Sequence, residues 1–229
     1  MNQPDMMRPQ RVQTWIFDLD NTLYPVTKQL LAHIDQHMGN FVAKYLGISR
    51  EEAHIVQKSY FKKYGLTLRG LMLNDGLDPE KYFEEMSPMD LNEVHPNPAL
   101  GAKISDLEGR KFIYTNASAQ HAKLVLDRME FDPNTFDAIF DIEAANYIPK
   151  PAIESYQLLC EKYTIDPTSA AMIDDIAQNL VPAAKMGMLT IWKNSGAEWA
   201  KNIEIENHIN YVVENLEDWL QSIKEHHKI

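Results

Sequence analysis

Two aspartates stand two positions apart in the stretch TWIFDLDNTLYP, residues 14–25, where an apolar run ends. A carboxylate can attack phosphorus and form an aspartyl-phosphate, which divides a very slow hydrolysis into two easier steps. Asp18, directly after the apolar run, is our candidate for that nucleophile. A second carboxyl group can protonate the leaving alkoxide and later take a proton from water, and we assign this role to Asp20. Taken alone, Asp20 would be explained equally well as a turn or helix-cap residue.

Three further groups of polar residues follow short apolar runs. They are Thr115 with Asn116 after KFIY, Lys150 in YIPKP, and Asp174 with Asp175 after AAMI. Taken singly, Thr115 could be a cap and Lys150 a surface lysine. The pair Asp174 and Asp175 is harder to explain as a cap, because a cap needs only one carboxylate and a second one beside it adds repulsion. We predict that Thr115, Asn116 and the following backbone amides hold phosphate oxygens. Lys150 would give its charge to the phosphate or to Asp18.

The acidic residues also form a candidate site for a hard divalent cation, which prefers oxygen ligands. We expect Mg²⁺ as the ion, with Asp18, Asp175 and a backbone carbonyl as ligands. Asp20 and Asp174 are the other acidic members of this site. Four carboxylates and a phosphate dianion outweigh Mg²⁺ and Lys150 by roughly three negative charges, and clustered like charges raise a pKa. Asp20 is therefore expected to be protonated in the substrate complex.

The apolar runs before these residues predict the strands of one sheet. They alternate with helical patterns over most of the chain, which is typical of an α/β fold with a parallel sheet covered by helices. The expected strands are residues 12–18, 111–115, 137–141, 170–174, 188–192 and 209–213. Ligands gather at the carboxyl ends of such strands, so we expect the polar groups to meet at one edge of the sheet.

Residues 25–95 interrupt this alternation and contain no convincing strand. Apolar residues at helical spacing over 30–45 predict one helix there, and further helix signals follow it. We therefore expect a helical subdomain at 25–95, inserted into a core made of residues 1–24 and 96–229.

The ends of the inserted helices are marked by individual residues. Gly47 is the expected end of the first helix, and Ser49 with Glu52 forms the pattern of a capping box at the start of the next. Asp78, before a proline, predicts another helix start. Asn97, between two prolines, is expected to cap the helix that returns to the core.

The composition restricts the partners and the compartment. The chain of 229 residues carries 22 basic and 33 acidic side chains, and its net charge of −11 opposes binding to nucleic acid polymers or anionic lipid. No uninterrupted apolar segment is long enough to cross a bilayer. Cys160 is the single cysteine and no basic leader precedes an apolar stretch, so we expect a cytoplasmic protein.

Together these signals resemble the four ordered motifs of the haloacid dehalogenase (HAD) superfamily of phosphohydrolases. DLDNT is similar to the first motif, DxDxT, and implies Asp18 as nucleophile, Asp20 as acid/base and Thr22 as a supporting residue. Thr115 matches the second motif, Lys150 the third, and the pair Asp174 and Asp175 the fourth, with Asp175 implied as the more direct metal ligand. The resemblance implies a three-layer Rossmann-like core with an α-helical cap of the C1 type, which would close over a small substrate.

Several stretches look closer to the pyrimidine 5'-nucleotidase branch, among them YGLTLRGLM, FDIEAANYIPKP and MIDDIAQNL. This resemblance implies a nucleoside monophosphate such as UMP or CMP as substrate. The stretch YGLTLRG departs from the branch at Leu66, where relatives often have Thr. Arg69 in the same stretch is a candidate contact to the phosphate or to a base carbonyl; the alternative is an exposed cap residue or a partner of an acid.

Other functions remain open on the sequence alone. The runner-up is a phosphatase of sugar phosphates or other small phosphomonoesters. A hydrolytic dehalogenase also uses an aspartate nucleophile, but it has no alkoxide to protonate, so Asp20 favours the phosphatase. A signalling receiver domain would place its acidic pair before the acceptor strand, whereas here the pair comes last. A non-catalytic phosphate-binding module is disfavoured because every catalytic position holds a competent residue.

Overall fold

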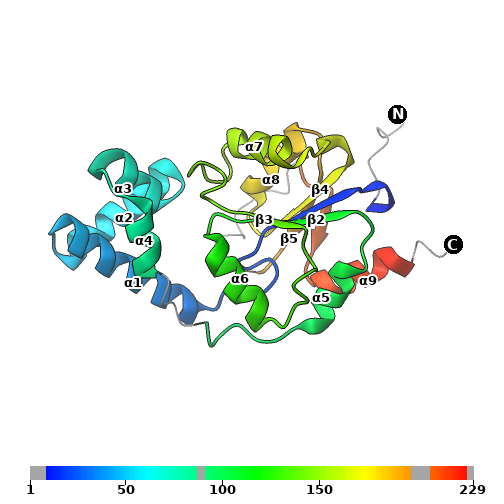
Figure 1. Ribbon diagram of the computed structural model, residues 1–229, viewed down its shortest axis with the longest axis horizontal. Helices are drawn as coiled ribbons and strands as arrows, with labels where there is room; N and C mark the ends of the chain where they lie inside the picture. The colour runs from blue at the N-terminus through cyan, green and yellow to red at the C-terminus, as the bar shows by residue number, and fades with distance from the viewer. Residues whose placement is uncertain (1–8, 87–90, 197–206, 226–229) are drawn as a thin grey trace.

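The computed structural model describes residues 9–86, 91–196 and 207–225 (Figure 1). Its strands are β1 (Thr14–Phe17), β2 (Arg110–Tyr114), β3 (Ala138–Phe140), β4 (Ala170–Asp174), β5 (Leu189–Lys193) and β6 (Tyr211–Val213). Its α-helices are α1 (Lys28–Leu46), α2 (Arg50–Tyr64), α3 (Thr67–Asp75), α4 (Pro79–Met86), α5 (Pro98–Ser105), α6 (Ala119–Arg128), α7 (Ile153–Tyr163), α8 (Ala177–Lys185) and α9 (Leu216–Glu225). The short 3-10 helices η1 (Pro9–Arg11) and η2 (Pro167–Ser169) complete the elements.

The strands form one parallel sheet in the order β3-β2-β1-β4-β5-β6, which confirms the predicted fold class and all six expected strands. Strand β1 lies in the middle, with Phe17 paired to Ile113 of β2 on one side and to Ile173 of β4 on the other. The residues that follow these three, Asp18, Tyr114 and Asp174, therefore lie at the same edge of the sheet. From β1 the strands follow one another outward as β2 and β3 on one side and as β4, β5 and β6 on the other. The carboxyl end of β1 is therefore the switch point at which α/β sheets bind ligands.

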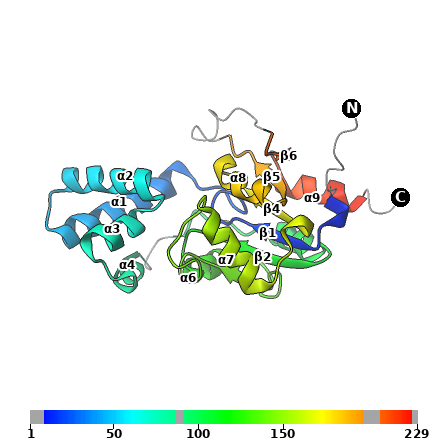
Figure 2. The same cartoon turned by 90° about the horizontal axis from the view of Figure 1, so that it is seen from above.

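The core has three layers because side chains alternate along each strand. Trp15 and Phe17 point to the face covered by α5, α6 and α9, whereas Ile16 points to the face covered by α7 and α8. Figure 1 shows these helix layers above and below the sheet, and Figure 2 shows the same core from above with α1 to α4 beside it. Among the described residues, none of the helices combines the length and the apolar character needed to span a membrane.

Helices α1 to α4 lie together beside the carboxyl edge of the sheet, on the left in Figure 1. Their inward side chains form a separate hydrophobic cluster, the cap cluster: Phe41, Val42, Ala53, Leu68, Leu71, Leu77 and Tyr82. Gly47 ends α1 in the left-handed conformation at φ 66°, and Ser49 forms a complete capping box with Glu52 at the start of α2. These helix signals act as expected.

The connections between the helical insertion and the core pack with the core. Leu30 of α1, together with Leu91 and Val94 of the returning segment, belongs to the core's hydrophobic cluster. The first turn of α1 is thus shared between the two parts, a few residues beyond the predicted boundary at residue 25. Residues 1–8 and 226–229, at the ends of the predicted core, lie outside the described residues.

Helix α3 was not predicted, and it begins without a side-chain cap because its N-cap residue is Leu66. The backbone of Leu66 is extended, at φ −142° and ψ 141°, as an N-cap requires. Thr at this position would supply the missing acceptor.

We expect Leu66→Thr to have a free energy of unfolding about 1 kcal/mol higher than that of Leu66→Val. The two substitutions remove similar apolar contacts, but only the Thr hydroxyl can accept a hydrogen bond from an amide in the first turn of α3. Denaturant unfolding of both variants measures the difference, and equal stability would contradict the capping explanation.

Candidate active site

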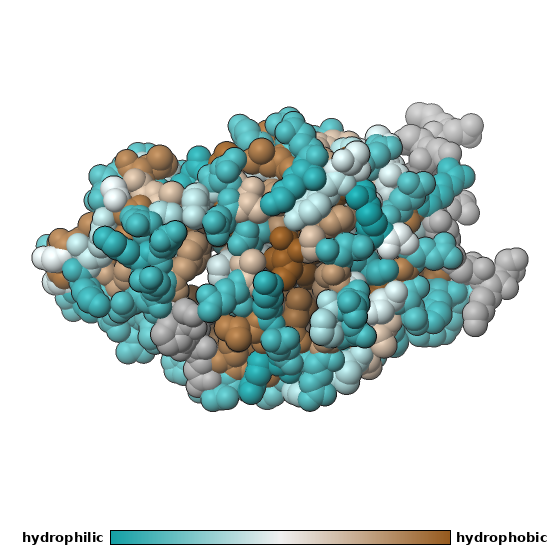
Figure 3. All heavy atoms as spheres, in the orientation of Figure 1, coloured by the Kyte–Doolittle hydropathy of each residue, from teal (hydrophilic) through white to brown (hydrophobic). Residues whose placement is uncertain are grey.

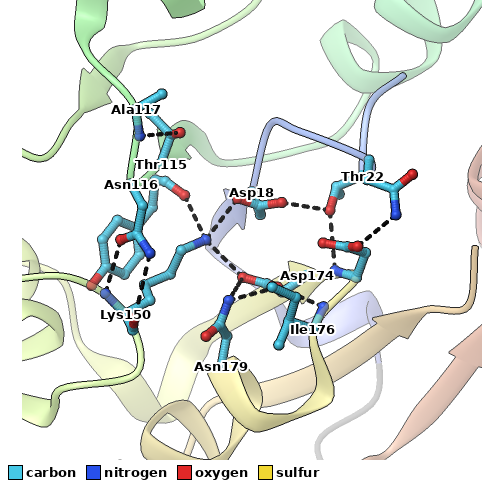
Figure 4. Close-up of polar contacts among 12 residues, drawn as sticks. Asp18, Thr22, Thr115, Asn116, Ala117, Lys150, Asp174, Ile176 and Asn179 are labelled. Atoms are coloured by element: carbon cyan, nitrogen blue, oxygen red, sulfur yellow. Dashed lines mark hydrogen bonds and ion pairs between the residues drawn. The ribbon is translucent and has the colours of Figure 1, made fainter. Parts of the chain in front are cut away.

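The predicted polar residues meet at the carboxyl edge of the sheet (Figure 4). Asp18 follows β1, Asp174 ends β4, and Lys150 enters from the loop between β3 and α7. All three side chains are buried, with 10, 0 and 1% of their area exposed. Charges so far from water need close partners, and the arrangement supplies them.

Lys150 is the centre of this network. Its Nζ lies 2.7 Å from Oδ1 of Asp18 and 2.7 Å from Oδ2 of Asp174, and it donates a third hydrogen bond of 3.0 Å to the carbonyl of Tyr114. Burial alone would lower the pKa of Lys150, but the charges and hydrogen bonds of Asp174 and Asp18 outweigh it and raise the pKa. Lys150 therefore stays positively charged, as expected for a residue that balances buried carboxylates.

Asp18 is held through both oxygens. Lys150 contacts Oδ1, and the hydroxyl of Thr22 donates to Oδ2 at 2.7 Å. Burial raises the pKa of Asp18 well above its ordinary value; Lys150 opposes this, and the charges of Asp174 and Asp175 add to it. Further positive charge near Asp18 would lower this pKa and favour the ionised carboxylate that a nucleophile requires.

Asp18, Asp174 and Asp175 bring carboxylate oxygens within 4.8 Å of one another. Oxygen ligands at this spacing fit a hard divalent cation. Among the described residues no other acidic side chain belongs to this group, so the carboxylate of Asp20, which we had included, lies outside it.

Asp174 and Asp175 are held by different donors. Asp174 accepts hydrogen bonds from Lys150, from the amide of Ile176 at 2.8 Å and from Nδ2 of Asn179 at 3.0 and 3.1 Å. Oδ2 of Asp175 accepts one from Asn21 at 2.6 Å. The hydrogen bond from Lys150 makes Asp174 a partner that fixes this lysine, and the contact with Asn21 orients Asp175.

Asp20 lies in a second cluster, with two residues that the sequence analysis missed. Its Oδ1 accepts a hydrogen bond from the hydroxyl of Tyr24 at 2.5 Å and lies 3.1 Å from Nε2 of His121. Burial raises the pKa of Asp20, but the hydrogen bond and charge of His121, with the hydrogen bond of Tyr24, outweigh it and lower the pKa. This direction is that of the protein without substrate, whereas our charge count included a phosphate dianion and left out His121, so protonation of Asp20 in the substrate complex stays a prediction.

The predicted phosphate-binding residues have different surroundings. Oγ1 of Thr115 accepts a hydrogen bond from the amide of Ala117 at 3.0 Å, and among the described residues its own hydroxyl proton has no acceptor. Thr115 can therefore donate to an anion. The side chain of Asn116 instead holds the backbone of Lys150, accepting from its amide at 2.9 Å and donating to its carbonyl at 3.3 Å. Asn116 thus positions the lysine.

Arg69 lies at the contact between the helical insertion and the core. Its Nη1 donates a hydrogen bond of 2.6 Å to the backbone carbonyl of Tyr147, in the loop that leads to Lys150, and the side chain of Tyr147 packs against the cap cluster. Gly65, after the end of α2, also lies close to this loop, since a Cβ added to it would be 3.0 Å from the ring of Pro149. The helical insertion therefore touches the core beside Lys150, and Figure 3 shows an opening between the two parts.

Comparisons with known proteins agree with this arrangement. The family model described as haloacid dehalogenase-like hydrolase matches residues 12–187. The chain is 25% identical over 192 residues to "Phosphate metabolism protein 8" of Saccharomyces cerevisiae. The alignment covers 77% of this chain and 60% of that protein's length.

Solved structures share the fold. A HAD phosphatase from Thermococcus onnurineus superposes with a TM-score of 0.60 at 19% identity, covering 93% of this chain and 97% of that one. L-2-haloacid dehalogenase from Xanthobacter autotrophicus superposes with a TM-score of 0.58 at 16% identity, covering 93% and 99%. Because a phosphatase and a dehalogenase superpose almost equally well, the reaction has to be argued from the site.

Proposed function

Because this chain belongs to the haloacid dehalogenase-like hydrolases, we propose that it is a Mg²⁺-dependent phosphomonoester hydrolase that works through an aspartyl-phosphate on Asp18. The observation that carries the proposal is the second carboxyl group, Asp20, held by two donors two residues beyond the nucleophile. Expulsion of an alkoxide requires such a proton donor, whereas expulsion of a halide does not.

In the proposed reaction, a carboxylate oxygen of Asp18 attacks the phosphorus of the substrate. The bond from phosphorus to the leaving oxygen breaks, and Asp20, whose pKa the negative charge of the bound phosphate would raise, gives its proton to that oxygen. Asp20 then takes a proton from water, whose oxygen attacks the phosphorus and displaces Asp18. The products are an alcohol and inorganic phosphate, and both carboxyl groups return to their starting forms.

The other side chains of the site would neutralise charge and orient the reacting groups. Thr115 would donate to a phosphate oxygen, and Lys150 keeps Asp18 in place while lowering the negative charge around it. A divalent cation held by Asp18 and Asp175 would neutralise phosphate charge and favour the ionised form of Asp18. Asn21 contacts the same Asp175 carboxylate at 2.6 Å and would orient it.

For the substrate, we propose a pyrimidine nucleoside monophosphate such as UMP or CMP. The proposal draws on the resemblance of YGLTLRGLM, in the cap, and FDIEAANYIPKP, in the Lys150 loop, to the nucleotidase branch. These two stretches contact each other through Arg69 and Tyr147, so they form one surface between the cap and the core. Closure of this cap over a small substrate would exclude water from the site.

Phosphate release from a panel of substrates tests the proposed function. The panel contains UMP, CMP, sugar phosphates and a 2-haloacid, each with Mg²⁺ and with an excess of chelator. We expect phosphate release that requires the divalent cation and is fastest with UMP or CMP. Halide release in place of phosphate release would contradict the phosphatase, activity without a divalent cation would contradict the metal, and a preference for sugar phosphates would remove only the nucleotide assignment.

A further inference from the structure

We infer that His121 is a positioning residue for the acid/base group: together with Tyr24 it holds Oδ1 of Asp20, and so reserves Oδ2 as the oxygen that exchanges protons with the substrate and with water. This inference rests on the proposed phosphomonoesterase and goes beyond it, because it assigns the orientation of Asp20 to a side chain 101 residues away in the chain.

The geometry of the Asp20 carboxylate is asymmetric. Both donors, the Tyr24 hydroxyl at 2.5 Å and Nε2 of His121 at 3.1 Å, reach the same oxygen, Oδ1. Among the residues that the structure describes, none donates a hydrogen bond to Oδ2. A carboxyl group whose first oxygen accepts two hydrogen bonds carries its own proton on the second. The oxygen left without a protein partner is thus the one suited to proton transfer.

The two donors are themselves fixed in place. Tyr24 is buried, with 4% of its area exposed, and is joined to Asp20 by a backbone bridge. His121 lies in the first turn of α6, where its amide donates to the N-cap side chain of Ser118 at 3.2 Å, and its side chain is only 14% exposed. The Asp20 side chain, 38% exposed, is more open than the other carboxylates of the site. A rigid pair of donors therefore holds one edge of a group whose other edge is accessible.

A histidine at this place could also serve only the packing of α6 against the core. The two roles differ in how the reaction depends on the leaving group. An alkyl phosphomonoester expels a strongly basic alkoxide and needs the proton from Asp20, whereas 4-nitrophenyl phosphate expels a stable anion that needs none. A defect in orienting Asp20 therefore slows transfer from the alkyl ester selectively, and a defect in packing slows both.

The experiment compares kcat/KM, which reports the steps up to formation of the aspartyl-phosphate, for 4-nitrophenyl phosphate and for the alkyl phosphomonoester that the unmodified protein hydrolyses fastest. For His121→Leu we expect a loss of about 10-fold or more with the alkyl ester and less than about 3-fold with the aryl ester. His121→Gln, whose Nε2 can donate from nearly the same place, is expected to recover most of the alkyl activity. Tyr24→Phe, which removes only the other donor, should show the same selective loss.

Three results would overturn the inference: equal losses with the two esters in His121→Leu and Tyr24→Phe, unchanged kcat/KM in both, or no recovery in His121→Gln. If His121→Leu does not fold, Tyr24→Phe and His121→Gln carry the comparison, with thermal unfolding as the check on structure. Asp20→Asn separates this inference from the proposed function. A selective loss in Asp20→Asn without one in the His121 and Tyr24 variants would reject the positioning role alone, whereas no phosphate release from the unmodified protein would reject both.

Discussion

Asp18→Asn is expected to lower phosphate release by about 10⁴-fold or more, because an amide oxygen cannot form the aspartyl-phosphate. The substitution keeps the size of the side chain and keeps an acceptor for Lys150 at Oδ1. The measurement is turnover of the best substrate with Mg²⁺ present. Full activity in Asp18→Asn would reject the mechanism.

The same variant should unfold at a higher temperature than the unmodified protein when no divalent cation is present. Burial holds the pKa of Asp18 above its ordinary value of 3.8, so the folded state binds this proton more tightly than the unfolded state does. The resulting loss of stability grows as the pH rises from 3.8 towards the raised pKa, and it persists at neutral pH. Asn carries no proton to lose, so the penalty disappears.

Asp106→Asn is a matched control for both measurements. Asp106 pairs with Lys224 on the surface of the core, with half of each side chain exposed. We expect full activity and little change in unfolding temperature, since exposed pairs contribute little to stability. A lower unfolding temperature in Asp18→Asn than in Asp106→Asn would show that the ionised Asp18 stabilises the fold, contrary to the direction of its pKa shift.

Lys150→Met is expected to destabilise the protein by about 3–5 kcal/mol, the largest effect on stability that we predict. It leaves Asp18 and Asp174, both buried, facing each other without the cation between them, and it frees the carbonyl of Tyr114. Denaturant unfolding at neutral pH, without divalent cations, measures the change.

Two comparisons make the Lys150 result specific. Lys224→Met removes an exposed lysine from a surface pair and should change the free energy of unfolding little. Adding Asp174→Asn to Lys150→Met should recover part of the lost stability, because it removes one of the two uncompensated charges. If Lys150→Met cost no more than Lys224→Met, the buried network would not have the role we give it.

The sheet and the main residues of the candidate site could be predicted from the sequence because their signals are local. Short apolar runs set the strands, and parallel strands bring their carboxyl ends together, which is why Asp18, Lys150 and Asp174 meet. Helix starts were equally readable where a capping residue was present, as at Ser49. Helix α3 lacks such a cap and contains Gly70, so no start signal marked it.

The parts that the sequence did not reveal depend on lateral contacts between distant segments. His121 reaches Asp20 across 101 residues, and no periodicity specifies which residue of α6 faces which loop. Tyr24 was closer to being readable, since it lies four residues after Asp20 in a tight bend. The hydrogen bonds of Asn116 and Arg69 to backbone groups of the Lys150 loop were likewise not indicated by their residue types, which suggested phosphate binding.

The contact between the cap and the Lys150 loop sets a thermodynamic scale for cap opening. One charge-assisted hydrogen bond, from Arg69 to the carbonyl of Tyr147, joins the two parts at this point, with the tyrosine ring packed on the cap cluster. Such a bond contributes about 1.5–3 kcal/mol, which by itself favours the docked arrangement by a factor of roughly ten to two hundred, before the packing of the tyrosine ring is added. Opening of the cap therefore has to break this bond and to expose that ring to water.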